Sequence, residues 1–150
     1  MDEIARIIST LKKTFKKNAW HGPTVMEALT DVSDEESRKK LGNTHSIGEL
    51  VLHMNAWGNF VVSRLVGDNN FQVTDQMNFP EVKRWSDAVS ALADSQEKLL
   101  EAIRNFPAQR LQELVPHGEF EYTFYTLIHG IIHHDLYHTG QIMLIKKALR

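Results

Sequence analysis

Histidine is the residue type in this sequence whose number and spacing point to chemistry. The 150-residue chain holds eight histidines, and four of them, His129, His133, His134 and His138, lie between positions 129 and 138. Short histidine-rich tracts are typical of metal binding. His129–His133 and His134–His138 both have i, i+4 spacing, which on a helix places two imidazoles on one face with Cβ atoms roughly 5–6 Å apart. Either pair could therefore converge on one ion.

The position of each pair around the helix separates them. On an ideal helix that advances ~100° per residue, one arc at about 160–220° from His129 is apolar, and it contains Leu127, Ile131, Ile142, Ile145 and Leu149. His138 falls near ~180° and His134 near ~140°, inside or beside this arc, whereas His129 and His133 fall near ~0° and ~40°. Only the His134–His138 pair is therefore predicted to face the core.

A third ligand should come from another helix. His53 is the only histidine in the interior of the second long helix, at the edge of its apolar face. Glu49, one turn earlier, could also ligate, but a capping role explains it adequately. Because the chain has no cysteine, imidazole and carboxylate are the strong ligands it offers, and imidazole favours zinc, nickel, copper or iron over magnesium or calcium. The alternative interpretation is that these are hydrogen-bonded core histidines without a metal.

The elements that must position these residues are helices, because apolar residues recur at threes and fours and no alternating run indicates a strand. Four long helices are expected, over about Asp2–Lys17, Ser46 to the stop at Gly67, Pro80–Arg104 and Thr123–Leu149. Ser46 and Glu49 form an S-x-x-E capping box at the start of the second. The sequence predicts an all-α, four-helix bundle formed by one domain over residues 1–150.

The connections are predicted to be irregular. A short helix is expected from Pro23 to about Thr30, and a polar connection with one further turn over residues 31–44. The segment containing Pro116, His117 and Gly118 is too interrupted for a long helix.

Composition excludes several classes of function. Net charge is -2 with acids and bases interspersed, which is not the basic surface of a nucleic-acid binder. No stretch approaches the ~20 apolar residues of a membrane span. The acidic start is unlike a signal peptide, and the absence of cysteine suits a reducing compartment. We therefore expect a cytoplasmic protein whose partners are small molecules, with no membrane or nucleic acid.

Two segments of the chain resemble the DinB/YfiT-like superfamily. They are His45–Trp57 (HSIGELVLHMNAW) and His134–Gln141 (HDLYHTGQ). The resemblance lies in a histidine followed four residues later by tryptophan, in the H-x-x-x-H-x-G-Q ending, and in the Trp20-His21-Gly22-Pro23 break. Outside these segments the similarity is one of length and helix order.

This resemblance implies a four-helix bundle of up-down-down-up order whose long crossover fits residues 67–80. It also implies a three-histidine metal site, carried here by His53, His134 and His138, the residues that the helical periodicity selects independently. Members of the family are often homodimers. Characterised relatives include thiol-dependent S-transferases and isomerases, and many others are labelled metal-dependent hydrolases.

The first hypothesis is therefore a metal-dependent enzyme, a thiol S-transferase or a hydrolase, that acts on a small electrophile with zinc or nickel. Any thiol must be a low-molecular-weight cosubstrate, because the chain has no cysteine. Candidates for residues that support the ligands or line the pocket are Trp57, Asp135, Tyr137 and Gln141, and no residue identifies itself as the catalytic base. The alternatives are a non-catalytic stress- or damage-response protein that binds a metal or ligand, and a metal-free interaction bundle.

Overall fold

A computed structural model describes residues 2–150 and confirms the all-α class. The long helices are α1 (Glu3–Phe15), α4 (Ile47–Leu65), α6 (Trp85–Asn105) and α7 (Phe124–Ala148). The short ones are α2 (Val25–Leu29), α3 (Asp34–Arg38), α5 (Asp75–Asn78) and a 3-10 turn at Ala108–Arg110. Pairing of β type within residues 2–150 is confined to one isolated bridge between Leu114 and Thr123. None of the helices in this range has the length and apolar character needed to cross a membrane.

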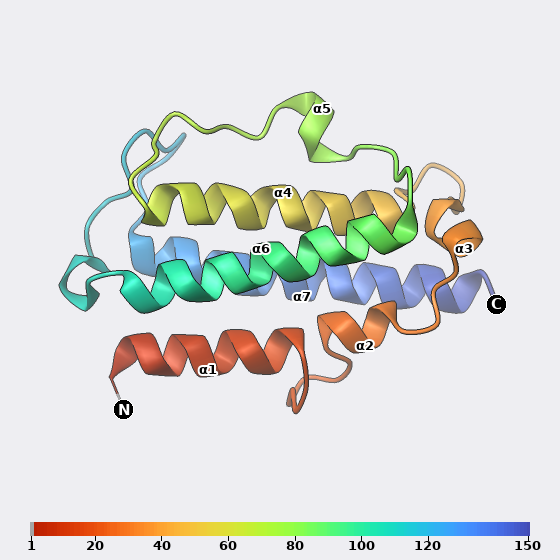
Figure 1. Ribbon diagram of the computed structural model, residues 1–150, viewed down its shortest axis with the longest axis horizontal. Coiled ribbons are helices and arrows are strands. Elements are labelled where there is room, and N and C mark those ends of the chain that lie inside the picture. The colour runs from red at the N-terminus through yellow and green to blue at the C-terminus, as the bar shows by residue number, and fades with distance from the viewer. Residues whose placement is uncertain (1) are drawn as a thin grey trace.

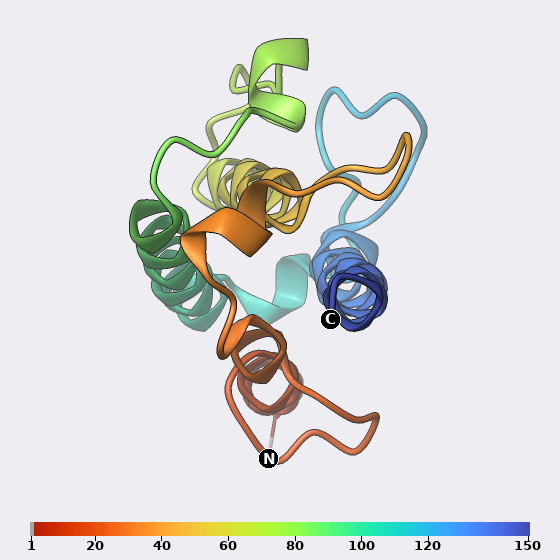
Figure 2. The same ribbon diagram turned by 90° about the vertical axis from the view of Figure 1, so that its right-hand side faces the viewer.

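The four long helices form a bundle with α4 between α6 and α7. In Figure 1, α1 and α7 run from left to right, whereas α4 and α6 run from right to left. Viewed end-on in Figure 2, α4 lies opposite α1, and α6 lies opposite α7. The connection from α4 to α6 passes over the outside of α4 and carries α5 (Figure 1). Helices α4 and α7 are therefore neighbours, although about sixty residues of chain separate them.

Local sequence signals fix the ends of α4. The Ser46 side chain accepts a hydrogen bond from the backbone N–H of Glu49, and the Glu49 carboxylate accepts one from the backbone N–H of Ser46 at 2.8 Å. This is the predicted capping box, and it satisfies two of the backbone donors that a helix start leaves unpaired. Gly67 follows the helix at φ 88°, a left-handed conformation that suits glycine and ends the helix.

The expected start of the third long helix at Pro80 is wrong, because α6 begins at Trp85. The Arg38 side chain donates to the backbone oxygens of Val82 at 3.4 Å and Lys83 at 2.8 Å. The Asp34 carboxylate accepts from the backbone N–H of Trp85 at 3.0 Å. Side chains of α3 thus hold the backbone groups around the start of α6, and residues 80–84 remain extended or irregular.

The core consists of two apolar clusters separated by buried polar residues. One cluster includes Ile7 and Ile128, and the other includes Ile47 and Ile142. Along α7 the buried apolar residues of the first cluster end at Ile132, and those of the second begin at Ile142. The buried residues between them on this helix are polar, namely Asp135, His138 and Thr139. The middle of the bundle therefore contains polar groups that need partners.

We expect Gly48→Ala to lower the free energy of unfolding by about 1–3 kcal/mol, the usual cost of overpacking a core. A Cβ at position 48 would lie 2.6 Å from Val82 Cγ1 and 2.9 Å from the backbone oxygen of Ser37, so α3 and α4 would have to move apart. Urea unfolding measures the change.

The matched control is Gly140→Ala in α7, where no atom lies within 4 Å of an added Cβ. Because alanine is the better helix former, this variant should keep its stability or gain up to about 1 kcal/mol. Equal effects of the two substitutions would contradict the close packing at Gly48.

Candidate metal centre

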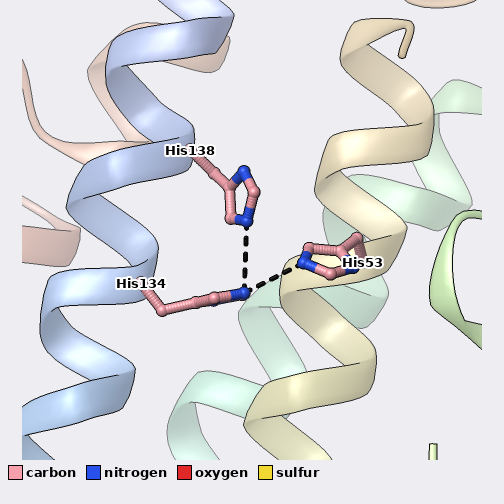
Figure 3. A group of neighbouring side chains, drawn as sticks. All are labelled: His53, His134 and His138. Atoms are coloured by element: carbon pink, nitrogen blue, oxygen red, sulfur yellow. Dashed lines mark hydrogen bonds between the residues drawn. The ribbon is translucent and has the colours of Figure 1, made fainter.

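Three histidine side chains from two helices meet at one point in the bundle. His134 and His138 lie one turn apart on α7, and His53 reaches them from α4 (Figure 3). The Nε2 atom of His134 lies 2.9 Å from Nε2 of His53 and 3.2 Å from Nε2 of His138. The structure thus brings together the three residues that the sequence selected, and their ligation of a metal stays a prediction.

The proton position on His53 is set by a residue outside α4. Its Nδ1 lies 2.8 Å from the backbone oxygen of Asn78 and 2.8 Å from Asn78 Oδ1. Trp57 Nε1 also donates to Oδ1, at 3.1 Å. Since these oxygens accept hydrogen bonds, Nδ1 of His53 is the donor, and its Nε2 carries a lone pair directed at His134.

Gln141 has the corresponding role for His138. Its Oε1 accepts from Nδ1 of His138 at 2.6 Å, which leaves the Nε2 lone pair of His138 facing His134. His134 itself is different, because its buried Nδ1 has no hydrogen-bond partner. The Asp135 carboxylate lies 3.8 Å from this nitrogen, beyond hydrogen-bond distance.

These three rings cannot satisfy one another without a cation. If His134 carries its proton on Nε2, it can donate to one neighbour, and the lone pair of the other remains unpaired. If the proton is on Nδ1, three lone pairs face one another. A divalent ion would accept the lone pairs of all three rings, and the ligand atoms of the three histidines lie within 4.8 Å of one another. The donor set therefore fits a transition-metal ion, and this group could hold one.

Burial favours the neutral imidazoles that a metal requires. It lowers the pKa of His134 and of His138 to about 4, and it also lowers the pKa of His53. Burial acts in the opposite direction on the adjacent carboxyl, raising the pKa of Asp135 to about 8. The folded chain thus holds the three nitrogens unprotonated at neutral pH.

Phe79 covers the site on the His53 side. Its ring stacks on that of His53 at 4.0 Å between centroids and on that of His45 at 3.7 Å. Sequence reasoning missed Asn78 and Phe79, because residues 67–80 were assigned only as a crossover, and it gave His45 no role at the site. The proximity of α5 to α4 is a tertiary contact that no local pattern records.

The remaining predicted residues have separate positions. Glu49 is used by the capping box and by an ion pair with Lys40 at 2.7 Å, which supports its structural interpretation. Tyr137 is 66% exposed, with its ring centroid 5.0 Å from that of His138. On the other face of α7, His129 and His133 lie outside the three-histidine group, with His133 exposed as the helical wheel indicates. None of the side chains described at this site has a contact that would assign it as a catalytic base.

A cavity of about 480 Å³ adjoins the metal centre and reaches it at His134. Trp57 lines it, whereas Tyr137 and Gln141 are not among its lining residues. The far wall comes from the segment around His117, which the sequence indicated only as irregular. A molecule in this cavity would lie beside the imidazole of His134.

Comparison with protein families matches residues 12–142 to the DinB superfamily. This span contains all three histidines and all four long helices except the first nine residues of α1 and the last six of α7. Comparison with curated proteins and with solved structures gives no match. The family match therefore names no reaction for this chain.

We expect the metal-free protein to lose stability as pH falls from about 6.5 to about 4. Unfolded histidines take up protons near pH 6.5, whereas folded His134 and His138 resist protonation until about pH 4, so acid favours the unfolded chain. Asp135 opposes this, because its pKa is about 8 when folded and 3.8 when free, so the folded chain binds the extra proton between these values.

Asp135→Asn removes the opposing carboxyl and isolates the histidines. Its free energy of unfolding should therefore fall more steeply toward acid than that of the wild type, as measured by urea unfolding with chelator present at several pH values. A flat profile in this variant would show that the histidines are not held neutral by the fold.

Proposed function

This chain belongs to the DinB superfamily, and we propose that it is a metal-dependent enzyme that joins a small-molecule thiol to a small electrophile. The observation that carries the proposal is the convergence of His53, His134 and His138 within 4.8 Å. Three protein ligands with an open position are typical of catalytic zinc sites, whereas structural sites close the shell with a fourth. The cavity beside His134 gives a substrate access to that position.

A zinc or nickel ion in this site supplies Lewis-acid chemistry that lowers the pKa of a thiol or a water. The chain has no cysteine, so the thiol is a cosubstrate. In the transfer, sulfur forms a bond to the electrophilic carbon, the leaving group departs with the bonding electrons, and the thiol proton passes to solvent. Hydrolysis would use water in place of sulfur, and the mostly apolar lining of the cavity suits the carbon skeleton of a thiol cosubstrate.

The surrounding side chains orient the ligands. Asn78 and Gln141 hold protons on the Nδ1 atoms of His53 and His138, so that the Nε2 atoms are free to bind. Trp57 fixes the Asn78 amide by donating to the same oxygen. Phe79 covers His53, which leaves the His134 side as the approach to the site.

We expect the wild type to bind one divalent zinc or nickel ion per chain. Single alanine variants of His53, His134 and His138 should each weaken binding by at least about 100-fold, beyond the 10–100-fold typical when a residue that only supports a ligand is lost. Titration calorimetry and elemental analysis measure this. His133→Ala, on the exposed side of α7, is the control and should keep the metal. Equal metal binding in all four variants would refute the site.

We expect the metal-loaded wild type to consume a thiol together with chlorodinitrobenzene and to release chloride. His138→Ala should lose this activity, because removal of one of three ligands empties the site. A nitrophenyl ester tested in parallel distinguishes transfer from hydrolysis. Metal bound with no turnover of either substrate would show that the site binds without catalysing, and an unchanged rate in His138→Ala would show that catalysis occurs elsewhere.

A further inference from the structure

The cavity beside the metal centre has walls suited to one class of ligand. It measures about 480 Å³, within the size range of pockets that take small organic molecules. Its lining is largely apolar, contributed by α4, by α7, by the start of the crossover and by residues 117–122. Two of these elements supply most of the aromatic surface.

Aromatic rings line two walls. On α4, Trp57 and Phe60 meet edge to face with centroids 5.2 Å apart, and on the loop before α7, Phe120 and Tyr122 lie 5.2 Å apart. Such rings offer faces and edges to another flat ring and add to the gain from apolar burial. The cavity thus favours an apolar body with an aromatic ring.

Charged side chains are few in the lining of the cavity. Glu119 is the one carboxylate in the lining, and no lysine or arginine from residues 2–150 lines the cavity. Arg64 lies 4.2 Å from the centroid of the Phe60 ring, but it is 2% exposed and donates to the backbone oxygens of Asp68 and Phe71. Its N–H groups are therefore engaged by oxygens of the protein, and its side chain is not among those that line the cavity.

The segment 116–122 is anchored at its base and exposed at its tip. Val115 donates its backbone N–H to the oxygen of Tyr122 at 2.9 Å, and Leu114 bridges to Thr123. At the tip, Phe120 is 71% exposed although it lines the cavity. A large ring left in water at a pocket rim gains burial when an apolar molecule lies against it.

We propose that this cavity binds a neutral, largely apolar small molecule bearing an aromatic ring, with its reactive end toward His134, and that residues 117–122 select it. A role of this pocket in catalysis rests on the proposed function, whereas binding of the small molecule does not need a metal. The pocket would then set which electrophile or thiol reaches the site.

Binding of two fluorescent dyes to chelator-treated protein tests the proposal. Phenylnaphthylamine is neutral and aromatic, and one molecule should bind per chain. Anilinonaphthalene sulfonate has similar rings and a negative charge, and should bind at least about tenfold more weakly because of Glu119. Glu119→Gln should narrow this difference. Equal or tighter binding of the anion by the wild type would overturn the charge preference.

A matched pair of glycines on α7 locates the dye. Gly130 lines the cavity and Gly140 does not, and neither has an atom within 4 Å of an added Cβ. Gly130→Leu should reduce affinity for the neutral dye at least about tenfold by filling the space, whereas Gly140→Leu should not change it. Circular dichroism and metal content should match the wild type in both. Unchanged dye binding by folded Gly130→Leu would overturn the proposal.

One further variant distinguishes binding of the dye in the cavity from binding of the metal. His53 is a predicted metal ligand that does not line the cavity. The His53→Ala variant should therefore lose metal and keep the neutral dye. If the wild type binds no metal but binds the dye, the proposed function fails and the pocket stands. If it binds metal but no dye, the pocket proposal fails alone.

Discussion

The centre of this bundle depends on one electrostatic constraint, which is that imidazole lone pairs from separate helices face one another. Asn78 fixes the proton of His53 on Nδ1, and Gln141 does the same for His138. His134 then cannot meet both neighbours, and its own Nδ1 is already buried without a partner. A buried polar group without a hydrogen bond costs about 1–3 kcal/mol. A cation at the common point would remove this cost for the facing Nε2 lone pairs, whereas Nδ1 of His134 would stay without a partner.

The rest of the fold places these nitrogens. The capping box at Ser46 sets where α4 begins, and Gly48 lets α4 approach Val82 and the Ser37 backbone more closely than any side chain would allow. Helix α4 is thereby fixed along its axis, so His53 stands level with His134 and His138. The two apolar clusters pack on either side of this level, which leaves the polar middle of α7 beside the site. The contacts that pack the helices therefore also set the positions of the three histidines.

The features that sequence predicted are those with a short-range cause. The apolar repeat of α7 separated His134 and His138 from His129 and His133, and the S-x-x-E pattern located the start of α4. The predicted start of α6 at Pro80 was wrong. The reason is that Arg38 and Asp34 in α3 hydrogen-bond to the backbone at Val82, Lys83 and Trp85. That interaction joins residues more than forty positions apart, so no local pattern contains it.

The same reason explains which parts of the site were not predicted. Asn78 and Phe79 reach His53 only because the crossover folds back over α4, and residues 117–122 reach the cavity only because the chain pairs at Leu114 and Thr123. Gln141 orients His138 from the same regular helix and was a candidate from the sequence, whereas Asn78 orients His53 from the crossover, where no periodicity indicates its position.

The two sides of the site are unequal. Phe79 stacks between His45 and His53 and closes the side formed by α5, whereas His134 borders a cavity with apolar walls. Of the three histidines, His134 is the one that lines this cavity. Under the proposed function, a substrate in this cavity would lie beside one ligand of the metal centre and against mostly apolar side chains. The walls of the cavity come both from α4 and α7, which also hold the histidines, and from two connections, which tolerate sequence change more readily than the helices they join.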